Sequence, residues 1–469
     1  MNRFHPYQTE CFQPMNATSH FKCTLRDGEI SVDAVTEDHI FYSEEGQPEA
    51  VISTISYLRT DDEKPQRPVM FFWNGGPGSA SSVLHLECFG PYCMIRDEEG
   101  KPLCDIKTEA ETILDICDLV YVDPVGVGYS RLLRESAAEK YFSVEGDARS
   151  ITFAIADWLR KHHRFNSPIY LCGESYGTIR TCRILEELKR DPIYGNRMML
   201  GLSVAGVILI GSALSINTDP ERLIEPELTL LTAALPSMAA VNWFHNHQMD
   251  TSREDFVNGA WSFARKHLLP ALFAGDDCDE AEITRLAKRL AYYTGIDADY
   301  FKASRLKLHS MEDFMTRVVA EKKQRVDLYD ARIMTPLSES YNSVGNENVP
   351  LQVMNGILAP MLGVGSERTY FTGNLNVYPE WNYSTGSTKS HLECLRSASE
   401  RMKDMKILVA SGLYDLCTLV GNTRYQFSHS GIESGRVIFK EYPGGHGVYS
   451  SKEGKTAFLA DVRALIGKH

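Results

Sequence analysis

The sequence predicts an α/β fold with a mostly parallel central sheet, interrupted by an inserted stretch of helices. From about residue 20 to 216, short apolar or β-branched runs alternate with Gly/Pro turns and helical stretches. A helical pattern replaces them between about 217 and 349, and strand-like runs return after about 350. We therefore expect a discontinuous core from residues 1–216 and 350–469, with residues 217–349 as an all-helical cap.

The expected strands are short apolar runs bounded by turn residues. They are Pro68–Trp73, Asp118–Asp123, Pro168–Cys172, Val204–Ile210, Met405–Ser411 and Arg436–Tyr442. Helices are expected over Glu145–Arg164, where apolar residues recur at helical spacing, and over Lys455–Ile466. In the cap, Ser252 and Asp277 have the residue types of helix N-caps, and the helix after Asp277 is expected to stop at Gly295.

Composition excludes several classes of protein. With 469 residues, 43% hydrophobic and 24% charged, the chain is ordinary for a globular protein, which excludes disorder, collagen and coiled coil. A formal charge of -13 repels nucleic acid and anionic membranes, so neither is an expected partner. Apolar runs fall short of the roughly 20 residues that a membrane-spanning helix needs, and the first residues lack a secretory signal. We therefore expect a cytoplasmic protein.

The cysteines do not form a recognisable metal or redox motif. All 11 are scattered without a CxxC pair, so most are expected to be reduced and buried. His245 and His247 form an HxH pair, but no carboxylate or Cys accompanies it at ligand spacing, which favours packing or surface roles. The sequence predicts no metal and no cofactor.

The strongest chemical motif is GESYG at residues 173–177, between an expected strand and an expected helix. A serine hydroxyl is a weak nucleophile until a sharp strand-to-helix turn holds it exposed beside a base. A GxSxG match by itself arises readily by chance because Gly is common. The strand before it and the helix after it favour a catalytic Ser175 over an accidental turn serine.

A base and an orienting acid for such a serine follow later strands in α/β-hydrolases, in the order Ser, Asp, His. Asp415 follows the expected strand MKILVAS, and His446 follows RVIFKEY. Each has an ordinary alternative, a turn-capping aspartate or a solvent-exposed histidine. Their joint placement at one sheet edge favours catalysis. Asp404 and the acids within 327–330 are rivals for the orienting role.

A third motif, WNGGPG at residues 73–78, also follows an expected strand. Glycines in such a turn bring backbone N–H groups close to a ligand, as stabilisation of an oxyanion requires. The alternative is a structural Gly/Pro turn, which by itself is the more common case. Asp123, at the end of another strand, is interpreted as a support for its loop rather than a second catalytic acid.

Together these blocks resemble the serine carboxypeptidase family. The matching segments are WNGGPG at Trp73, VDPVGVGYS at Val122, GESYG at Gly173, SGLYDL at Ser411 and GGHG at Gly444. The similarity runs from about residue 28 to the end, and LPSMAAVNWFHNH from Leu235 and VDLYDAR from Val326 resemble bacterial members in particular. The resemblance implies an α/β-hydrolase core that removes the C-terminal residue of peptides through an acyl-enzyme.

The resemblance also implies a role for each site residue. Ser175 would be the nucleophile, His446 the general base and acid, and Asp415 its orienting acid. The backbone N–H groups of Gly76 and Tyr176 would form the oxyanion hole. The free α-carboxylate of the substrate would be bound by Asn74, Gly75 and Glu174, with Glu87 as a weak further candidate whose spacing is off by at least one residue.

Two carboxylates in contact do not both stay ionised, so Glu174 would share a proton with the substrate terminus. Peptide hydrolysis is therefore expected at mildly acidic pH, with a higher optimum for esters or amides that lack the carboxylate. The chain departs from the family at two positions. Ser79 stands where exported members often have a disulfide-bonded Cys, and Gly447 stands where many have Met.

The sequence leaves two alternative functions open. One is an esterase or acyltransferase that uses the same three residues, and the other is a catalytically silent binding protein on this scaffold. The expected partner is a peptide with a free C-terminus, and association into a homodimer is also left open.

Overall fold

The computed structural model describes residues 12–26, 28–62, 66–97, 101–188, 202–214, 226–246, 251–338, 348–365, 368–384 and 389–467. Within them, a ten-stranded sheet has the order β1-β2-β3-β7-β4-β9-β10-β13-β14, with β8 paired to β3. Its strands are β1 (Asn16–Leu25), β2 (Gly28–Tyr42), β3 (Pro48–Arg59), β4 (Val69–Trp73), β7 (Asp118–Asp123), β8 (Arg131–Leu132), β9 (Ile169–Glu174), β10 (Val204–Ile210), β13 (Lys406–Gly412) and β14 (Val437–Tyr442).

The sheet is parallel where the predicted site residues follow its strands. Neighbours from β7 through β4, β9, β10 and β13 to β14 are all parallel, whereas β1, β2, β3 and β7 pair antiparallel. All six predicted strands form, with small differences at their ends. Because parallel strands point the same way, the loops after β4, β9, β13 and β14 meet at one edge.

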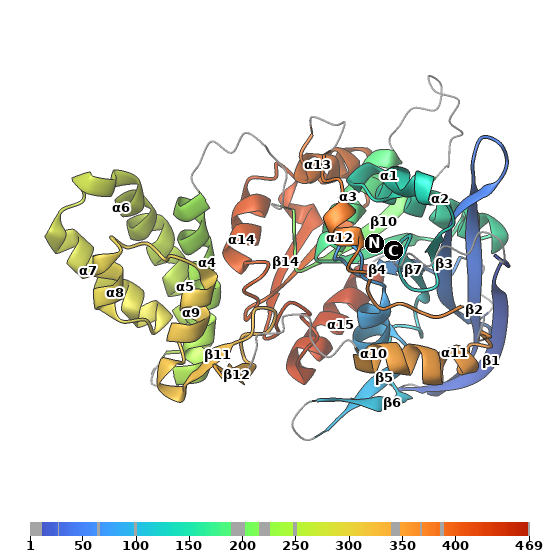
Figure 1. Cartoon of the computed structure of the whole chain (residues 1–469), viewed down its shortest axis with the longest axis horizontal. Helices are drawn as coiled ribbons and strands as arrows, with labels where there is room; N and C mark the ends of the chain where they lie inside the picture. The colour runs from blue at the N-terminus through green and yellow to red at the C-terminus, as the bar shows by residue number, and fades with distance from the viewer. Residues whose placement is uncertain are drawn as a thin grey trace.

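Helices cover both faces of the sheet (Figure 1). On one face lie α1 (Ala138–Tyr141), α2 (Val144–Lys161), α3 (Tyr176–Glu187) and α13 (His391–Arg401). On the other lie α15 (Lys452–Ile466), α10 (Asn348–Val353) and the π-helix η1 (Leu84–Phe89). Among the described helices, none combines the length and the apolar character that crossing a membrane requires. The mostly parallel, two-faced arrangement confirms the predicted α/β core.

The insert stands to one side of the core, beside α14 (Val420–Ser428) (Figure 1). Its helices are α4 (Pro226–Asn246), α5 (Arg253–Phe263), α6 (Leu269–Ala274), α7 (Glu280–Thr294), α8 (Ala298–Ala303) and α9 (Met311–Arg317). The prediction that it is all-helical is wrong, because β11 (Gln324–Val326) pairs antiparallel with β12 (Met334–Pro336). Asp327 caps the turn between them by accepting the N–H groups of Tyr329 and Asp330.

The helix ends predicted within the insert are confirmed at Ser252 and Gly295 and wrong at Asp277. Ser252 caps α5, and α7 stops at Gly295 in the left-handed region, as predicted. Asp277 is not the N-cap of α7. It closes a 3₁₀ turn, and Asp279 caps the helix instead by accepting the N–H of Glu282. The predicted core boundary at 350 falls inside α10, and the boundary at 216 lies outside the described residues.

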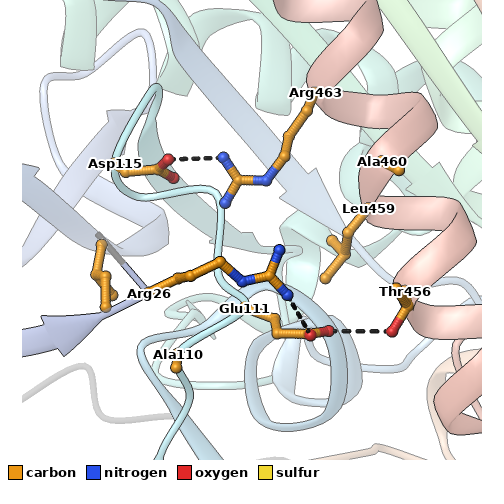
Figure 2. A pocket seen from close by; sticks show the side chains of 9 residues that line it. Arg26, Ala110, Glu111, Asp115, Thr456, Leu459, Ala460 and Arg463 are labelled. Atoms are coloured by element: carbon orange, nitrogen blue, oxygen red, sulfur yellow. Dashed lines mark hydrogen bonds and ion pairs between the residues drawn. The ribbon is translucent and has the colours of Figure 1, made fainter. Parts of the chain in front are cut away.

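An ion pair and a hydrogen bond attach α15 to the rest of the core (Figure 2). Arg463 lies 2.6 Å from Asp115, and Glu111 accepts hydrogen bonds from Arg26 and Thr456. These side chains surround a small cavity of about 250 Å³ in which every charged group is paired. The cavity therefore offers no unpaired charged side chain to a ligand, and the contacts around it join α15 to the rest of the core.

A buried ion pair joins α2 to α3. Arg180 Nε donates to Asp147 Oδ2 at 2.7 Å, with the two side chains 0% and 2% exposed. The same guanidinium donates from Nη1 to the backbone carbonyl of Asn74 at 2.6 Å. Arg180 therefore fixes both the helix pair and the loop that follows β4.

We expect Arg180→Met to destabilise the fold by roughly 3–5 kcal/mol, because it leaves the Asp147 carboxylate buried without its partner. The measurement is the free energy of unfolding in urea. Arg285→Met, which removes an exposed pair with Glu282, is the matched control and should leave the unfolding midpoint nearly unchanged. Equal effects of the two substitutions would contradict the role of burial.

Candidate active site

Ser175 occupies the turn between β9 and α3 that the sequence predicts. Its φ of 58° and ψ of -125° are rare for a residue with a side chain. The turn is tight, since a Cβ at Gly173 would lie 2.2 Å from the carbonyl oxygen of Gly177. The Ser175 hydroxyl caps no N–H of α3 and has no hydrogen bond within the described residues. No other described group therefore holds this hydroxyl.

The predicted base and acid contact each other. His446 Nδ1 lies 2.8 Å from Asp415 Oδ2. Asp415 is fully buried, and its Oδ1 accepts the backbone N–H groups of Cys417 at 2.7 Å and Thr418 at 2.9 Å. The Thr418 hydroxyl also donates to Oδ2. These donors hold the carboxylate in one orientation, so it can fix the tautomer and direction of the imidazole.

The imidazole of His446 also lies close to the serine turn. A Cβ placed on Gly211 would be 3.1 Å from Cε1 of His446, and Ile210, the preceding residue, accepts the N–H of Ser175 at 2.9 Å. The imidazole ring and Ser175 therefore both lie next to the segment formed by Ile210 and Gly211. No hydrogen bond joins the Ser175 hydroxyl to His446 in the described structure, and such bonds often tighten only when substrate binds.

The rival acids do not contact the imidazole. Asp327 caps the turn after β11, and Asp330 pairs with Arg332 at the insert. Asp404 lies exposed before β13. Of these acids, only Asp415 is hydrogen-bonded to His446 within the described residues.

The insert supports the loops that carry the acid and the base. The backbone N–H of His446 donates to the carbonyl of Tyr329 at 2.6 Å, and Leu416 N–H donates to Leu328 at 3.1 Å. Sequence reasoning missed these contacts, because backbone carbonyls leave no mark in a residue pattern. His245, singled out in the HxH pair, belongs to no group of three or more potential metal ligands among the described residues. It lies 2.7 Å from the carbonyl of Ala331 and thereby anchors this segment.

The two backbone N–H groups predicted for the oxyanion hole belong to loops that touch each other. A Cβ on Gly75 would lie 2.6 Å from the Tyr176 nitrogen and 2.8 Å from Ser175 Cβ, so the WNGGPG loop lies against the serine turn. In the described structure, the N–H groups of Gly76 and Tyr176 have no acceptor. Both are available to an oxyanion that forms at Ser175.

Asn74 and Glu174 form a buried pair beside the serine. Asn74 Nδ2 donates to Glu174 Oε1 at 2.8 Å, while its Oδ1 accepts the N–H of Leu84 at 3.1 Å. The side chains are nearly buried, at 3% and 6% exposed. The Leu84 contact fixes which end of the amide faces Glu174.

Burial and neighbouring charges shift the pKa values of both titratable groups. Burial raises the pKa of Glu174 above its usual 4.5, and this outweighs the opposing effects of His446 and its two hydrogen-bond donors. Burial lowers the pKa of His446, but the charge and hydrogen bond of Asp415 raise it by more, so it lies above 6.5. Glu174 therefore keeps a proton at a higher pH than an exposed glutamate.

A cavity of about 1100 Å³ adjoins these residues. From the core it is lined by Glu87, Glu174, His446 and Tyr449, and from the insert by Phe244 and Ile333. Glu87 sits on η1 and is paired with Arg96 at 2.9 Å. The cavity is large enough for a peptide terminus, and the insert forms one of its walls.

The structure also bears on the predictions made for the cysteines and for Asp123. The described cysteines are free, most of them buried, as predicted. Asp123 accepts the Ser81 N–H at 2.8 Å and the Tyr370 hydroxyl at 3.1 Å, so it supports the loop after β4. Its pKa is raised to about 6 by burial. His247 lies outside the described residues.

Comparison with known proteins gives the family. The serine carboxypeptidase family profile matches residues 55–430, which is most of the chain. This chain belongs to the serine carboxypeptidase family. Serine carboxypeptidase-like 5 of Arabidopsis thaliana is 26% identical over 149 residues, and serine carboxypeptidase-like 2 is 25% identical over 147. Each match covers 31% of this chain, and the chain spans about a third of the length of these relatives, 33%.

A solved structure shares the fold of this chain. Kex1Δp, a prohormone-processing carboxypeptidase from Saccharomyces cerevisiae, superposes with a TM-score of 0.57 at 12% identity. The match covers 92% of this chain and 91% of that protein. The similarity confirms the α/β-hydrolase fold. The roles of individual site residues stay predictions.

We expect Asp415→Asn to lower the pKa of His446, because the charge that raises it is removed while burial, which lowers it, remains. The measurement is an NMR titration of the His446 ring nitrogens. Asp404→Asn, which changes a rival acid, is the control and should leave the titration in place. A His446 pKa that does not move in Asp415→Asn would refute the Asp415 charge as the cause of the raised value.

Proposed function

We propose that the protein is a serine carboxypeptidase that hydrolyses the C-terminal peptide bond of peptides with a free terminus. The observation that carries the proposal is the buried Asn74–Glu174 pair, of which Glu174 directly precedes Ser175 and lines the same cavity as His446. An esterase has no need of a buried carboxyl beside its serine. A carboxyl that holds a proton can bind the carboxylate at the end of a peptide.

In this mechanism Ser175 attacks the carbonyl carbon of the last peptide bond while His446 takes its hydroxyl proton. The N–H groups of Gly76 and Tyr176 stabilise the oxyanion that forms. His446 then gives the proton to the departing amine, and the acyl-enzyme is hydrolysed by a water that His446 activates. Asp415 holds the imidazole throughout and stabilises its charged form.

Recognition of the substrate terminus falls to the residues around Glu174. The protonated carboxyl of Glu174 donates to the substrate carboxylate, and Asn74 and the N–H of Gly75 supply further donors. Glu87 is retained as a fourth contributor because it lines the same cavity. Its negative charge raises the pKa of Glu174 further and so favours the protonated form.

We further propose that the chain is nearest in pattern to bacterial members of the family and works in the cytoplasm. The first proposal rests on the segments from Leu235 and Val326, which form part of α4 and the support for His446. The second is supported by the free thiols of the described cysteines and by Ser79, since reduced thiols persist in reducing compartments.

The substrate class can be tested with a peptide acid, its C-terminal amide and a blocked ester. We expect kcat/KM for the acid to exceed that for the amide by about 100-fold or more, because the amide cannot share the proton of Glu174. An organophosphonate probe should label Ser175 in the folded protein, and Ser175→Ala should block labelling. Equal rates for acid and amide would favour an esterase, and no labelling would favour a silent protein.

The pH dependence tests the role of Glu174. Activity on every substrate should fall as pH falls through the raised pKa of His446, because the base must be neutral. Activity on the peptide acid should also fall as pH rises through the raised pKa of Glu174. Glu174→Gln removes the titrating proton, so the alkaline limb for the acid should flatten. The acidic limb should move to lower pH for acid and ester alike, because the Glu174 charge no longer raises the pKa of His446. If the alkaline limb for the peptide acid persists in Glu174→Gln, Glu174 is excluded as the group whose titration causes that limb.

A further inference from the structure

A tyrosine from the loop after His446 reaches back to the buried glutamate. The Tyr449 hydroxyl donates to Glu174 Oε2, while Asn74 donates to Oε1. Tyr449 is 5% exposed and lines the same cavity as His446. Each oxygen of the Glu174 carboxyl therefore has one fixed donor, and the two donors come from different loops.

The space that Tyr449 occupies depends on a glycine two residues earlier. A Cβ on Gly447 would lie 3.0 Å from both Cε2 and Cζ of Tyr449, and 3.3 Å from its hydroxyl oxygen. The tyrosine ring therefore packs directly on the Gly447 backbone. Gly447 stands where many family members have Met, and a side chain there would displace the ring by a few tenths of an ångström. The absence of a side chain at residue 447 therefore leaves room for the Tyr449 ring in its present position.

Few other groups influence the Glu174 carboxyl. The titratable and polar side chains that interact electrostatically with Glu174 come from four parts of the fold. They are Asn74 after β4, Glu87 and Cys88 on η1, Cys172 on β9, and His446 and Tyr449 after β14. No Lys or Arg of the described residues pairs with Glu174. Among its neighbours only Asn74 and Tyr449 donate hydrogen bonds to it.

We propose that Tyr449 is a positioning residue for recognition of the substrate carboxylate: it holds Glu174 in the orientation that shares a proton with the terminus of a peptide. This inference rests on the proposed carboxypeptidase function. A carboxyl held at one oxygen only can turn about its Cγ–Cδ bond. Held at both oxygens, it presents its proton in one direction, as preorganised binding requires.

The hydrogen bond of Tyr449 also sets the pH range of this recognition. It favours the ionised carboxylate and so lowers the pKa of Glu174 against the effect of burial. Without it, Glu174 would keep its proton to a higher pH. The loss of Tyr449 should therefore weaken binding of peptide acids at acidic pH through poorer orientation, yet shift the alkaline limb of their profile upward.

The experiment compares Tyr449→Phe with the parent enzyme on a peptide acid and a blocked ester across pH. We expect KM for the acid to rise about tenfold at the pH optimum of the parent enzyme, as loss of one hydrogen bond to a charged group implies, with kcat little changed. The alkaline limb for the acid should move to higher pH, and the ester profile should stay in place. Gly447→Ala should change KM and the limb in the same directions by a smaller amount.

Tyr442→Phe is the matched control. It also removes a hydrogen bond from a buried tyrosine to a carboxylate, here Asp461 at 2.8 Å, but not at the cavity. It should leave KM and both profiles unchanged. Unaltered peptide kinetics in Tyr449→Phe, or an equal loss on acid and ester at every pH, would overturn the proposal, since the latter is what a general structural defect produces.

A binding measurement separates this inference from the proposed function. In a Ser175→Ala background, calorimetry gives the Kd of an N-blocked dipeptide acid and of its amide, with and without Tyr449→Phe. The inference expects about tenfold weaker binding of the acid only. If the parent enzyme fails to hydrolyse peptide acids, the proposed function fails, and the Kd values still decide the role of Tyr449. An unchanged Kd, or no binding of the acid to Ser175→Ala, would reject it.

Discussion

The constraint that governs the cavity is a carboxyl group buried without a Lys or Arg partner among the described residues. Glu174 is 6% exposed, and no Lys or Arg of the described residues pairs with it. An isolated carboxylate in such surroundings is costly, so the group either accepts strong hydrogen bonds or holds a proton. Asn74 and Tyr449 supply the hydrogen bonds. The balance between the donors and burial determines when the carboxyl can share a proton with a second carboxylate.

The same residues connect this site to the stability of the core. Asn74 accepts the N–H of Leu84 through its side chain and the Arg180 guanidinium through its backbone carbonyl. Arg180 is in turn paired with Asp147 between α2 and α3. The position of the Asn74 amide is therefore determined by two helices and the π-helix together. Its direction toward Glu174 is a property of the packed core and not of the loop alone.

Besides lining the cavity, the insert holds the loops that carry His446 and Asp415. Its segment after β11 accepts the backbone N–H of His446 and pairs with the loop of Asp415. His245 holds that segment from α4. Movement of the insert would therefore displace the imidazole together with the cavity wall. This arrangement places one wall of the cavity and the support of the imidazole in one structural unit.

The sequence by itself determined the six strands β4, β7, β9, β10, β13 and β14, the three motif turns and the pairing of Asp415 with His446. Strands buried on both faces need continuous apolar runs, and the ends of parallel strands meet at one edge, so both are readable from order and composition. Only the tertiary structure decided that Thr418, Tyr329 and Tyr449 serve the site, since these contacts cross between loops whose spacing is set by packing. Local rules also failed where two residues satisfy them equally, as with Asp277 and Asp279.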